Sequence, residues 1–204
     1  MAFYNAPLMQ MQESLSPHIR IADMPLALSA LDAIVFDFDG VLTDDRVYVD
    51  CEGHEFVCCS RKDGLGFDIL RRTGLKLFIL STEKNEVVSK RGEKLRVPVA
   101  QGVTDKLATL MELGGVHGFD LTRALFVGND INDLPAMRAC GFSACPADAH
   151  PAVLTEAAFV LRTAGGMGVA REIVEGLLGI EPIVAWHERK LPVRSALEVR
   201  QPAG

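Results

Sequence analysis

Short apolar runs alternate with longer segments of helical spacing along most of this chain. Runs of this kind are typical of strands that are buried on both faces of a sheet. Strands that alternate with helices form a parallel sheet covered by helices on both sides. We therefore expect a three-layer α/β fold of the Rossmann type, with strands at residues 33–38, 75–80, 97–100, 124–127, 141–145 and 158–161 and helices at 66–73, 84–95, 105–113, 133–140 and 168–178.

One segment breaks this alternation. Residues 46–50 and 54–58 are typical of an antiparallel β-hairpin, with Gly53 in its turn. We expect residues 1–30 to form an N-terminal arm with a short helix near 26–31, residues 31–180 to form one core, and residues 181–204 to form a tail. The tail is either a flexible end or a strap docked on a partner.

Composition and charge exclude several classes of protein. A formal charge of -6 and a pI of about 5.4 argue against a nucleic-acid binder, which needs a positive surface. The five cysteines lack the spacing of zinc or disulfide frameworks, so we expect reduced thiols. There is no secretory signal and no apolar run of the ~18 residues that a membrane span needs, so we expect a cytoplasmic protein without membrane contact.

Two carboxylates follow the first predicted strand: Asp37 and Asp39, just before Gly40. Ligands of parallel sheets bind outside the carboxyl ends of the strands. Neighbouring carboxylates repel each other there unless a cation lies between them, and Mg²⁺ prefers oxygen ligands that include phosphate. Asp37 is then a candidate nucleophile and Asp39 a candidate general acid and base. The alternative is a turn whose Asp residues only cap backbone groups.

Residues 36–44 resemble the first motif of the haloacid dehalogenase superfamily of phosphatases. Ser81 resembles the hydroxyl of the second motif, Lys106 the lysine of the third, and residues 127–133 the acidic fourth motif. The resemblance implies catalytic roles for Asp37, Asp39, Ser81 and Lys106. It also implies Mg²⁺ held by the Asp37 carboxylate, the Asp39 carbonyl and the fourth motif.

The fourth motif departs from the usual pattern at its metal ligand. Asn129 stands where the family usually has Asp, and Asp130 follows it. An Asn oxygen can bind Mg²⁺ but contributes no charge, so either Asn129 or Asp130 is the direct ligand. Asp133 would then orient Lys106 or a metal-bound water.

Only about forty residues separate Asp37 from Ser81, which is too few for the cap domain of larger relatives. The chain therefore resembles the capless subgroup, which includes phosphatases of 3-deoxy-manno-octulosonate 8-phosphate and of 2-keto-3-deoxy-nononate 9-phosphate. Residues 62–66, 147–151 and 164–168 also match this subgroup. The resemblance implies a homotetramer in which a neighbour helps to close each site; the alternative is a monomer with an open site.

The resemblance also suggests a substrate. Thr82, Glu83 and Lys84 are similar to the Gly-Glu-Lys of the nononate enzyme, and Arg91 and Lys94 fall where that enzyme has substrate-selecting basic residues. We therefore place Thr82, Glu83, Arg91 and Lys94 at the substrate and favour a nine-carbon sugar acid phosphate over an eight-carbon one. The alternative is that this basic helix only faces solvent.

Two other functions fit part of the pattern. The chain also resembles the C-terminal domain of some acylneuraminate cytidylyltransferases, and Asn129 would suit a weakly active homologue retained for oligomerisation or partner binding. A phosphoacceptor signalling domain also carries acidic residues at strand ends. Asp39 favours turnover instead, because it would release the phosphate.

Overall fold

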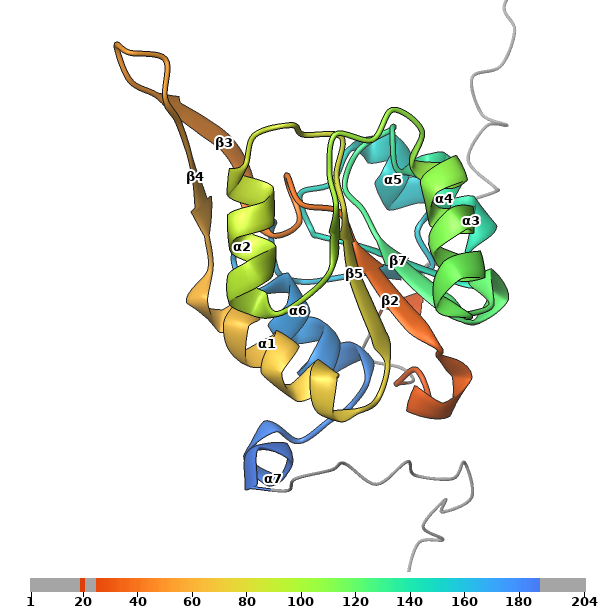
Figure 1. The fold of residues 1–204 in the computed structure, drawn as a ribbon. Coiled ribbons are helices and arrows are strands. Elements are labelled where there is room, and N and C mark those ends of the chain that lie inside the picture. The colour runs from red at the N-terminus through yellow and green to blue at the C-terminus, as the bar shows by residue number, and fades with distance from the viewer. Residues whose placement is uncertain (1–18, 21–24, 188–204) are drawn as a thin grey trace, which may run out of the picture.

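The computed structural model describes residues 19–20 and 25–187, and its centre is a seven-stranded sheet in which every neighbouring pair is parallel (Figure 1). The strand order is β1-β9-β8-β7-β2-β5-β6. The strands are β1 (Ile19–Arg20), β2 (Ala33–Phe36), β5 (Lys76–Leu80), β6 (Val99–Ala100), β7 (Ala124–Val127), β8 (Phe142–Cys145) and β9 (Phe159–Val160). The α/β prediction is confirmed.

Strand β2 lies inside the sheet and is completely buried. Successive side chains of a strand point to opposite faces, so Ile34 and Phe36 join one apolar core while Ala33 and Val35 join another. The first core is covered by α1 (Arg61–Arg72), α2 (Val87–Leu95), α6 (Val169–Glu172) and the π-helix η3 (Ile173–Leu177). The second is covered by α3 (Lys106–His117), α4 (Leu134–Ala139) and α5 (Pro151–Glu156).

The chain reverses its direction of winding at β2. It runs from β2 to β5 and β6 on one side, then crosses back to β7, β8 and β9 on the other. The crevice at such a switch point is where ligands bind in open α/β sheets. The residues that follow β2 therefore lie at the entrance of this crevice.

Some helices begin or end at other residues than expected, because capping residues set their boundaries. Helix α1 begins at Arg61 rather than at residue 66, because the Ser60 side chain accepts a hydrogen bond from the Lys62 N–H at 3.2 Å. Helix α3 follows Asp105, whose carboxylate accepts a hydrogen bond from the Ala108 N–H, and it ends at Gly118 with φ 65°. The first turns of α1 contain glycines, which have a low helix propensity, so the sequence does not indicate that the helix begins at Arg61.

Several elements lie outside the predicted pattern. Strand β1 pairs with β9 from within the expected N-terminal arm, and α5 was not predicted. Helix α7 (Pro182–His187) packs on α1, where Arg72 donates a hydrogen bond to the Ala185 carbonyl at 2.9 Å. This part of the expected tail is therefore docked on the core, while the prediction for residues 188–204 lies outside the described residues. The 3₁₀ turns are η1 (Leu28–Ala30), which confirms the short helix expected near 26–31, and η2 (Leu121–Arg123).

The predicted hairpin is confirmed as β3 (Thr43–Val49) paired with β4 (Glu55–Cys59). Figure 1 shows it projecting away from the three layers. The interval between Asp37 and Ser81 holds the hairpin, α1 and β5, so the fold has no cap domain there. None of the helices in the described ranges is long and apolar enough to cross a membrane.

Candidate active site

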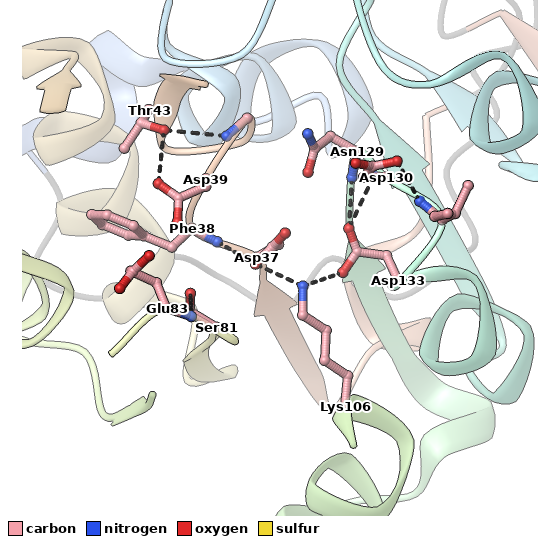
Figure 2. A network of polar contacts seen from close by, with 12 residues as sticks. Asp37, Phe38, Asp39, Thr43, Ser81, Glu83, Lys106, Asn129, Asp130 and Asp133 are labelled. Carbon is pink, nitrogen blue, oxygen red and sulfur yellow. Dashed lines mark hydrogen bonds and ion pairs between the residues drawn. The ribbon is translucent and has the colours of Figure 1, made fainter. Parts of the chain in front are cut away.

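Asp37 is the first residue after β2, and its backbone extends the sheet by donating to the Val127 carbonyl at 2.8 Å. The side chain is buried at 5% exposure. Its Oδ1 accepts a hydrogen bond from the Phe38 N–H at 2.7 Å and forms an ion pair with Lys106 Nζ at 2.9 Å (Figure 2). Asp37 Oδ2 is left facing the loop after β7.

Lys106 lies between two buried carboxylates. It is the first residue of α3, and its Nζ lies 2.9 Å from Asp37 Oδ1 and 2.6 Å from Asp133 Oδ1. Burial raises the pKa of Asp37 and the Asp133 charge adds to this, while the charge and hydrogen bond of Lys106 oppose it. Burial alone would lower the pKa of Lys106, but the two carboxylates outweigh it and the pKa is raised. Lys106 therefore stays charged next to Asp37.

Asp133 shapes the loop after β7 as well as holding Lys106. Its Oδ2 accepts hydrogen bonds from the backbone N–H groups of Asn129 at 2.9 Å and Asp130 at 3.2 Å. A Cβ on Gly128 would lie 2.6 Å from the Asp133 Cβ, so only glycine fits there. Asp133 thus connects Lys106 to the backbone that carries Asn129, as the sequence predicts for a residue that supports the site indirectly.

The two candidate ligands of the fourth motif point in different directions. Asp130 is exposed, and its Oδ1 accepts a hydrogen bond from the Ile131 N–H at 2.7 Å (Figure 2). The Asn129 amide instead has one terminal atom 2.8 Å from the Asp39 carbonyl oxygen and 3.3 Å from Asp37 Oδ2. The geometry therefore favours Asn129 over Asp130 as the residue that faces Asp37.

The Asn129 amide fits either of two states of this site. With its NH₂ toward Asp37 and Asp39, it would donate hydrogen bonds to both oxygens. With its oxygen in that place, three oxygens face one another, and only a cation makes that arrangement favourable. Within residues 19–20 and 25–187, His, Cys, Asp and Glu side chains form no group of three that could hold a metal. A cation here would thus depend on an amide and a carbonyl oxygen.

Asp39 is half-buried next to this cluster, and Thr43 Oγ1 donates a hydrogen bond to its Oδ1 at 3.3 Å. Burial raises the pKa of Asp39, and the negative charges of Glu83 and Asp45 raise it further. A higher pKa suits a carboxyl group that must donate a proton. Gly40 follows with φ 71°, and a Cβ there would lie 1.9 Å from the side-chain nitrogen of Asn129. This close approach requires glycine.

Ser81 directly follows β5 and is almost completely buried at 1% exposure. Its Oγ accepts a hydrogen bond from the Glu83 N–H at 3.1 Å, which leaves its hydroxyl proton available. Figure 2 shows Glu83 beside Ser81, on the side of Asp39. Glu83 Oε1 accepts hydrogen bonds from the backbone N–H groups of Lys84 and Asn85 at 2.6 and 2.7 Å, whereas Thr82 is exposed.

Arg91 and Lys94 lie on α2. Arg91 donates a hydrogen bond from Nη2 to the Ser60 carbonyl at 2.7 Å, and Lys94 is exposed. In the part of the chain that the structure describes, no hydrogen bond or ion pair joins either of them to Asp37, Asp39 or Ser81. The structure thus brings together the residues of the four motifs and Glu83, and leaves Arg91 at the base of the hairpin.

Two residues near the site had no predicted role. Gln101 accepts a hydrogen bond from the Ser89 N–H at 3.0 Å and donates one to the Lys84 carbonyl at 3.2 Å, so it ties α2 to the Glu83 loop. Asp63 is completely buried, and its Oδ1 accepts a hydrogen bond from the Ala170 N–H at 2.8 Å. The Ser60–Asp63 spacing resembles a capping box for α1, but Asp63 caps α6 instead.

Comparisons with known proteins agree with this geometry. The model of the haloacid dehalogenase-like hydrolases matches residues 77–173. The 3-deoxy-D-manno-octulosonate 8-phosphate phosphatase of Escherichia coli is 30% identical over 158 residues, which are 77% of this chain and 84% of that enzyme. The chain belongs to the haloacid dehalogenase-like hydrolases. Its similarity to these enzymes makes it a phosphatase.

Solved structures support the assignment to haloacid dehalogenase-like hydrolases. A member of this family from Streptomyces avermitilis has 44% identity and a TM-score of 0.74, over 76% of this chain and 90% of that one. The 3-deoxy-D-manno-octulosonate 8-phosphate phosphatase of Moraxella catarrhalis, in complex with magnesium ion, phosphate ion and a KDO molecule, has 26% identity and a TM-score of 0.73, over 79% of this chain and 96% of that one. A divalent cation is thus present in a structural neighbour.

Proposed function

We propose that this phosphatase is a Mg²⁺-dependent phosphomonoester hydrolase that acts through an aspartyl phosphate on Asp37. The observation that carries the proposal is the buried chain Asp37–Lys106–Asp133, with Asp39 and the Asn129 amide on the open side of Asp37. A carboxylate is costly to bury, and this arrangement leaves Asp37 Oδ2 facing the Asn129 amide. A packing role would not need these groups at the ends of three strands.

In the first step, a carboxylate oxygen of Asp37 attacks the phosphorus atom, and the bond from phosphorus to the sugar oxygen breaks. Asp39 gives its proton to that leaving oxygen. Lys106 offsets the negative charge shared by Asp37 and the phosphoryl group, and the Ser81 hydroxyl donates a hydrogen bond to a phosphoryl oxygen. Burial raises the pKa of Asp39, which favours the protonated form that this step needs.

In the second step, water attacks the phosphorus atom of the aspartyl phosphate while Asp39 accepts its proton. The bond from phosphorus to the Asp37 oxygen breaks, so Asp37 is restored as a carboxylate and inorganic phosphate leaves. Asp133 takes no direct part, but it keeps Lys106 in place through both steps.

Residues Asp37, Asp39 through its carbonyl, and Asn129 would hold the Mg²⁺ ion. When bound, this ion neutralises negative charge on the phosphoryl oxygens. Without a second acidic side chain at position 129, the ligand set carries less charge than two carboxylates would supply. We therefore propose a site of moderate Mg²⁺ affinity.

The proposed substrate is a small phosphorylated 2-keto-3-deoxy sugar acid. The Escherichia coli and Moraxella catarrhalis relatives are phosphatases of the eight-carbon octulosonate 8-phosphate, which supports that substrate. Glu83 beside Ser81 and Asp39 supports the nine-carbon nononate or acylneuraminate 9-phosphate, through its resemblance to the Gly-Glu-Lys pattern. Asp39 must reach the sugar oxygen, so Glu83, whose charge acts on Asp39, would lie near the leaving group.

A substrate panel tests the proposal. Phosphate release is measured with and without Mg²⁺ on the eight-carbon and nine-carbon keto acid phosphates and on neutral sugar phosphates of similar size. We expect the keto acid phosphates to be preferred by kcat/KM, and Glu83→Ala to reduce the nine-carbon preference. Equal turnover of neutral sugar phosphates would contradict the substrate class, and no turnover of any member would favour a role in oligomerisation.

We also propose that the protein forms a homotetramer through its hairpin. Four large apolar side chains on β3 and β4 are more than half exposed: Val47, Tyr48, Val49 and Phe56. Val47 and Val49 point to one side of the hairpin, and Tyr48 with its cross-strand partner Phe56 points to the other, so both sides of this projecting element carry exposed apolar side chains, as is typical of an interface. A neighbouring subunit seated on it would also exclude water from the crevice, which an open sheet edge alone does not do.

A further inference from the structure

A buried carboxylate links α1 to the start of α6. Asp63 has 0% exposure, and its Oδ1 accepts a hydrogen bond from the Ala170 N–H at 2.8 Å. Its Oδ2 is also buried and makes no hydrogen bond of normal geometry among the described residues, although the Arg91 charge and the Arg171 N–H also act to lower the pKa of this carboxyl group. Burying a carboxylate with one unpaired oxygen is costly, so this contact is unusual for a position that only fills space.

The two helix backbones touch at the same place. A Cβ on Gly66 would lie 2.7 Å from the Ala170 carbonyl carbon and 2.8 Å from the Arg171 nitrogen. Gly66 thus lets α1 approach α6 closely, and Asp63 fixes the approach by capping the first turn of α6. The position of the first residues of α6 is therefore set from α1.

The loop before α6 packs directly against the turn that follows Asp37. A Cβ on Gly165 would lie 2.2 Å from the Gly40 carbonyl oxygen, and one on Gly166 would lie 2.5 Å from the Asp44 nitrogen. The Gly166 N–H donates a hydrogen bond to the Val41 carbonyl at 3.0 Å. Backbone therefore meets backbone, and a shift of this loop moves the turn that carries Asp39.

From these contacts we propose that Asp63 is a positioning residue for the reaction. It acts through Ala170 and the Gly165–Gly166 loop to hold the Asp39 carbonyl and carboxylate in register with Asp37. The inference rests on the proposed roles of Asp37 and Asp39. A displacement of about 1 Å at a reacting group can cost on the order of a hundredfold in rate, so a contact this remote can matter for turnover.

The test compares three variants of Asp63 in the full chain, with Mg²⁺ and the best substrate of the panel. Asp63→Ala and Asp63→Leu remove the cap, whereas Asp63→Asn keeps an oxygen that accepts from Ala170. We expect the first two to lower kcat by roughly twentyfold or more and to raise the Mg²⁺ concentration for half-maximal activity, with KM changed less than about threefold. Asp63→Asn should restore kcat to within about threefold of the wild type.

Val153→Ala is the matched control, because it opens a cavity in the core on the opposite face of the sheet. It should lower the thermal midpoint but leave kcat unchanged. Folding of each variant is checked by circular dichroism, and Asp63→Leu covers the case in which Asp63→Ala does not fold. The inference is overturned if a folded Asp63 variant without the cap has the same kcat as Val153→Ala. It is also overturned if folded Asp63→Asn does not return kcat to near the wild-type value.

Asp37→Asn is measured in parallel to separate this inference from the proposed function. An active Asp37→Asn protein would remove the proposed nucleophile and the inference with it. An inactive Asp37→Asn protein beside an Asp63→Ala protein of normal kcat would overturn only the role of Asp63.

Discussion

The side-chain amide of Asn129 approaches the Asp39 carbonyl oxygen to 2.8 Å. The two residues come from loops after different strands, β7 and β2, which are neighbours in the sheet. Because the same amide atom lies 3.3 Å from Asp37 Oδ2, one rotation of the amide changes the site from a hydrogen-bonded state to a three-oxygen state. This relationship makes Asn129 the residue on which Mg²⁺ affinity should depend.

Replacing Asn129 should change the Mg²⁺ requirement in a predictable direction. Asn129→Asp adds a negative ligand, so the Mg²⁺ concentration for half-maximal activity should fall by roughly tenfold, and Asn129→Ala should raise it by at least as much. The measurement is a Mg²⁺ activation curve at saturating substrate. Asp130→Ala is the control, because its side chain faces the Ile131 N–H, and it should shift the curve less than about threefold. The opposite ranking of the Asn129 and Asp130 variants would contradict the assignment.

Removing the charge of Lys106 should affect both stability and turnover. In Lys106→Met, Asp37 and Asp133 remain buried without their cation, so we expect unfolding in urea to show a loss of about 3–5 kcal/mol. Adding Asp133→Asn should recover part of this loss, because one unpaired charge is then removed. We also expect kcat to fall by roughly a hundredfold or more. If the stability losses of Lys106→Met and Asp133→Asn simply add in the double variant, the proposed coupling of Asp37, Lys106 and Asp133 is contradicted. A Lys106→Met protein of normal kcat would also contradict it.

Asp63 should make stability depend on pH. Burial raises its pKa from 3.8 to about 6, with the Ala170 N–H acting in the opposite direction. A carboxyl group whose pKa is higher in the folded state contributes stability that is fully present below pH 3.8 and is lost as the pH rises through about 6. Two pKa units correspond to a loss on the order of 3 kcal/mol.

The corresponding measurement compares the free energy of unfolding of wild type and Asp63→Asn at pH 4.5 and pH 7.5, which lie on either side of the expected pKa of about 6. The variant, which cannot ionise, should gain stability relative to the wild type as the pH rises. A difference between the two proteins that does not change with pH would show that Asp63 titrates near its ordinary pKa.

The hairpin should determine the oligomeric state. Tyr48 and Phe56 are cross-strand partners and are 56% and 57% exposed. In Tyr48→Asp and Phe56→Asp, a charge enters the proposed interface, so light scattering after size exclusion should show a smaller species, and activity should fall. Met111→Asp on α3 is an equally exposed control that should leave the assembly intact. A monomeric wild-type protein would refute the tetramer.

The sequence was sufficient for the sheet and for the residues of the four motifs. Residues 33–36 and 124–127 are apolar at every position, which suits a strand buried on both faces, and both runs form completely buried strands. The motif residues follow strands, so their convergence at one edge follows from the parallel arrangement. Short elements were missed because their signal is too brief: β1 has two residues and pairs with a distant strand, β9.

Contacts between distant segments could not be predicted from the sequence. Asp63 looks like a capping residue of its own helix, and only the packing of α1 on α6 brings it to Ala170. Arg91 has the spacing of a substrate-binding residue, but its hydrogen bond goes to the Ser60 carbonyl. The choice between Asn129 and Asp130 depended on the direction of two side chains in one loop, which no spacing in the sequence determines.

The most direct test of the central claim is to locate the phosphoryl group during turnover. The wild-type protein is mixed with Mg²⁺ and the best substrate of the panel, quenched in acid within the first turnovers, and mapped by peptide mass spectrometry. We predict a transient phosphoryl group on Asp37 that is absent from Asp37→Asn, together with loss of phosphate release in that variant. A phosphoryl group on another residue, or an Asp37→Asn protein that retains turnover, would contradict the account.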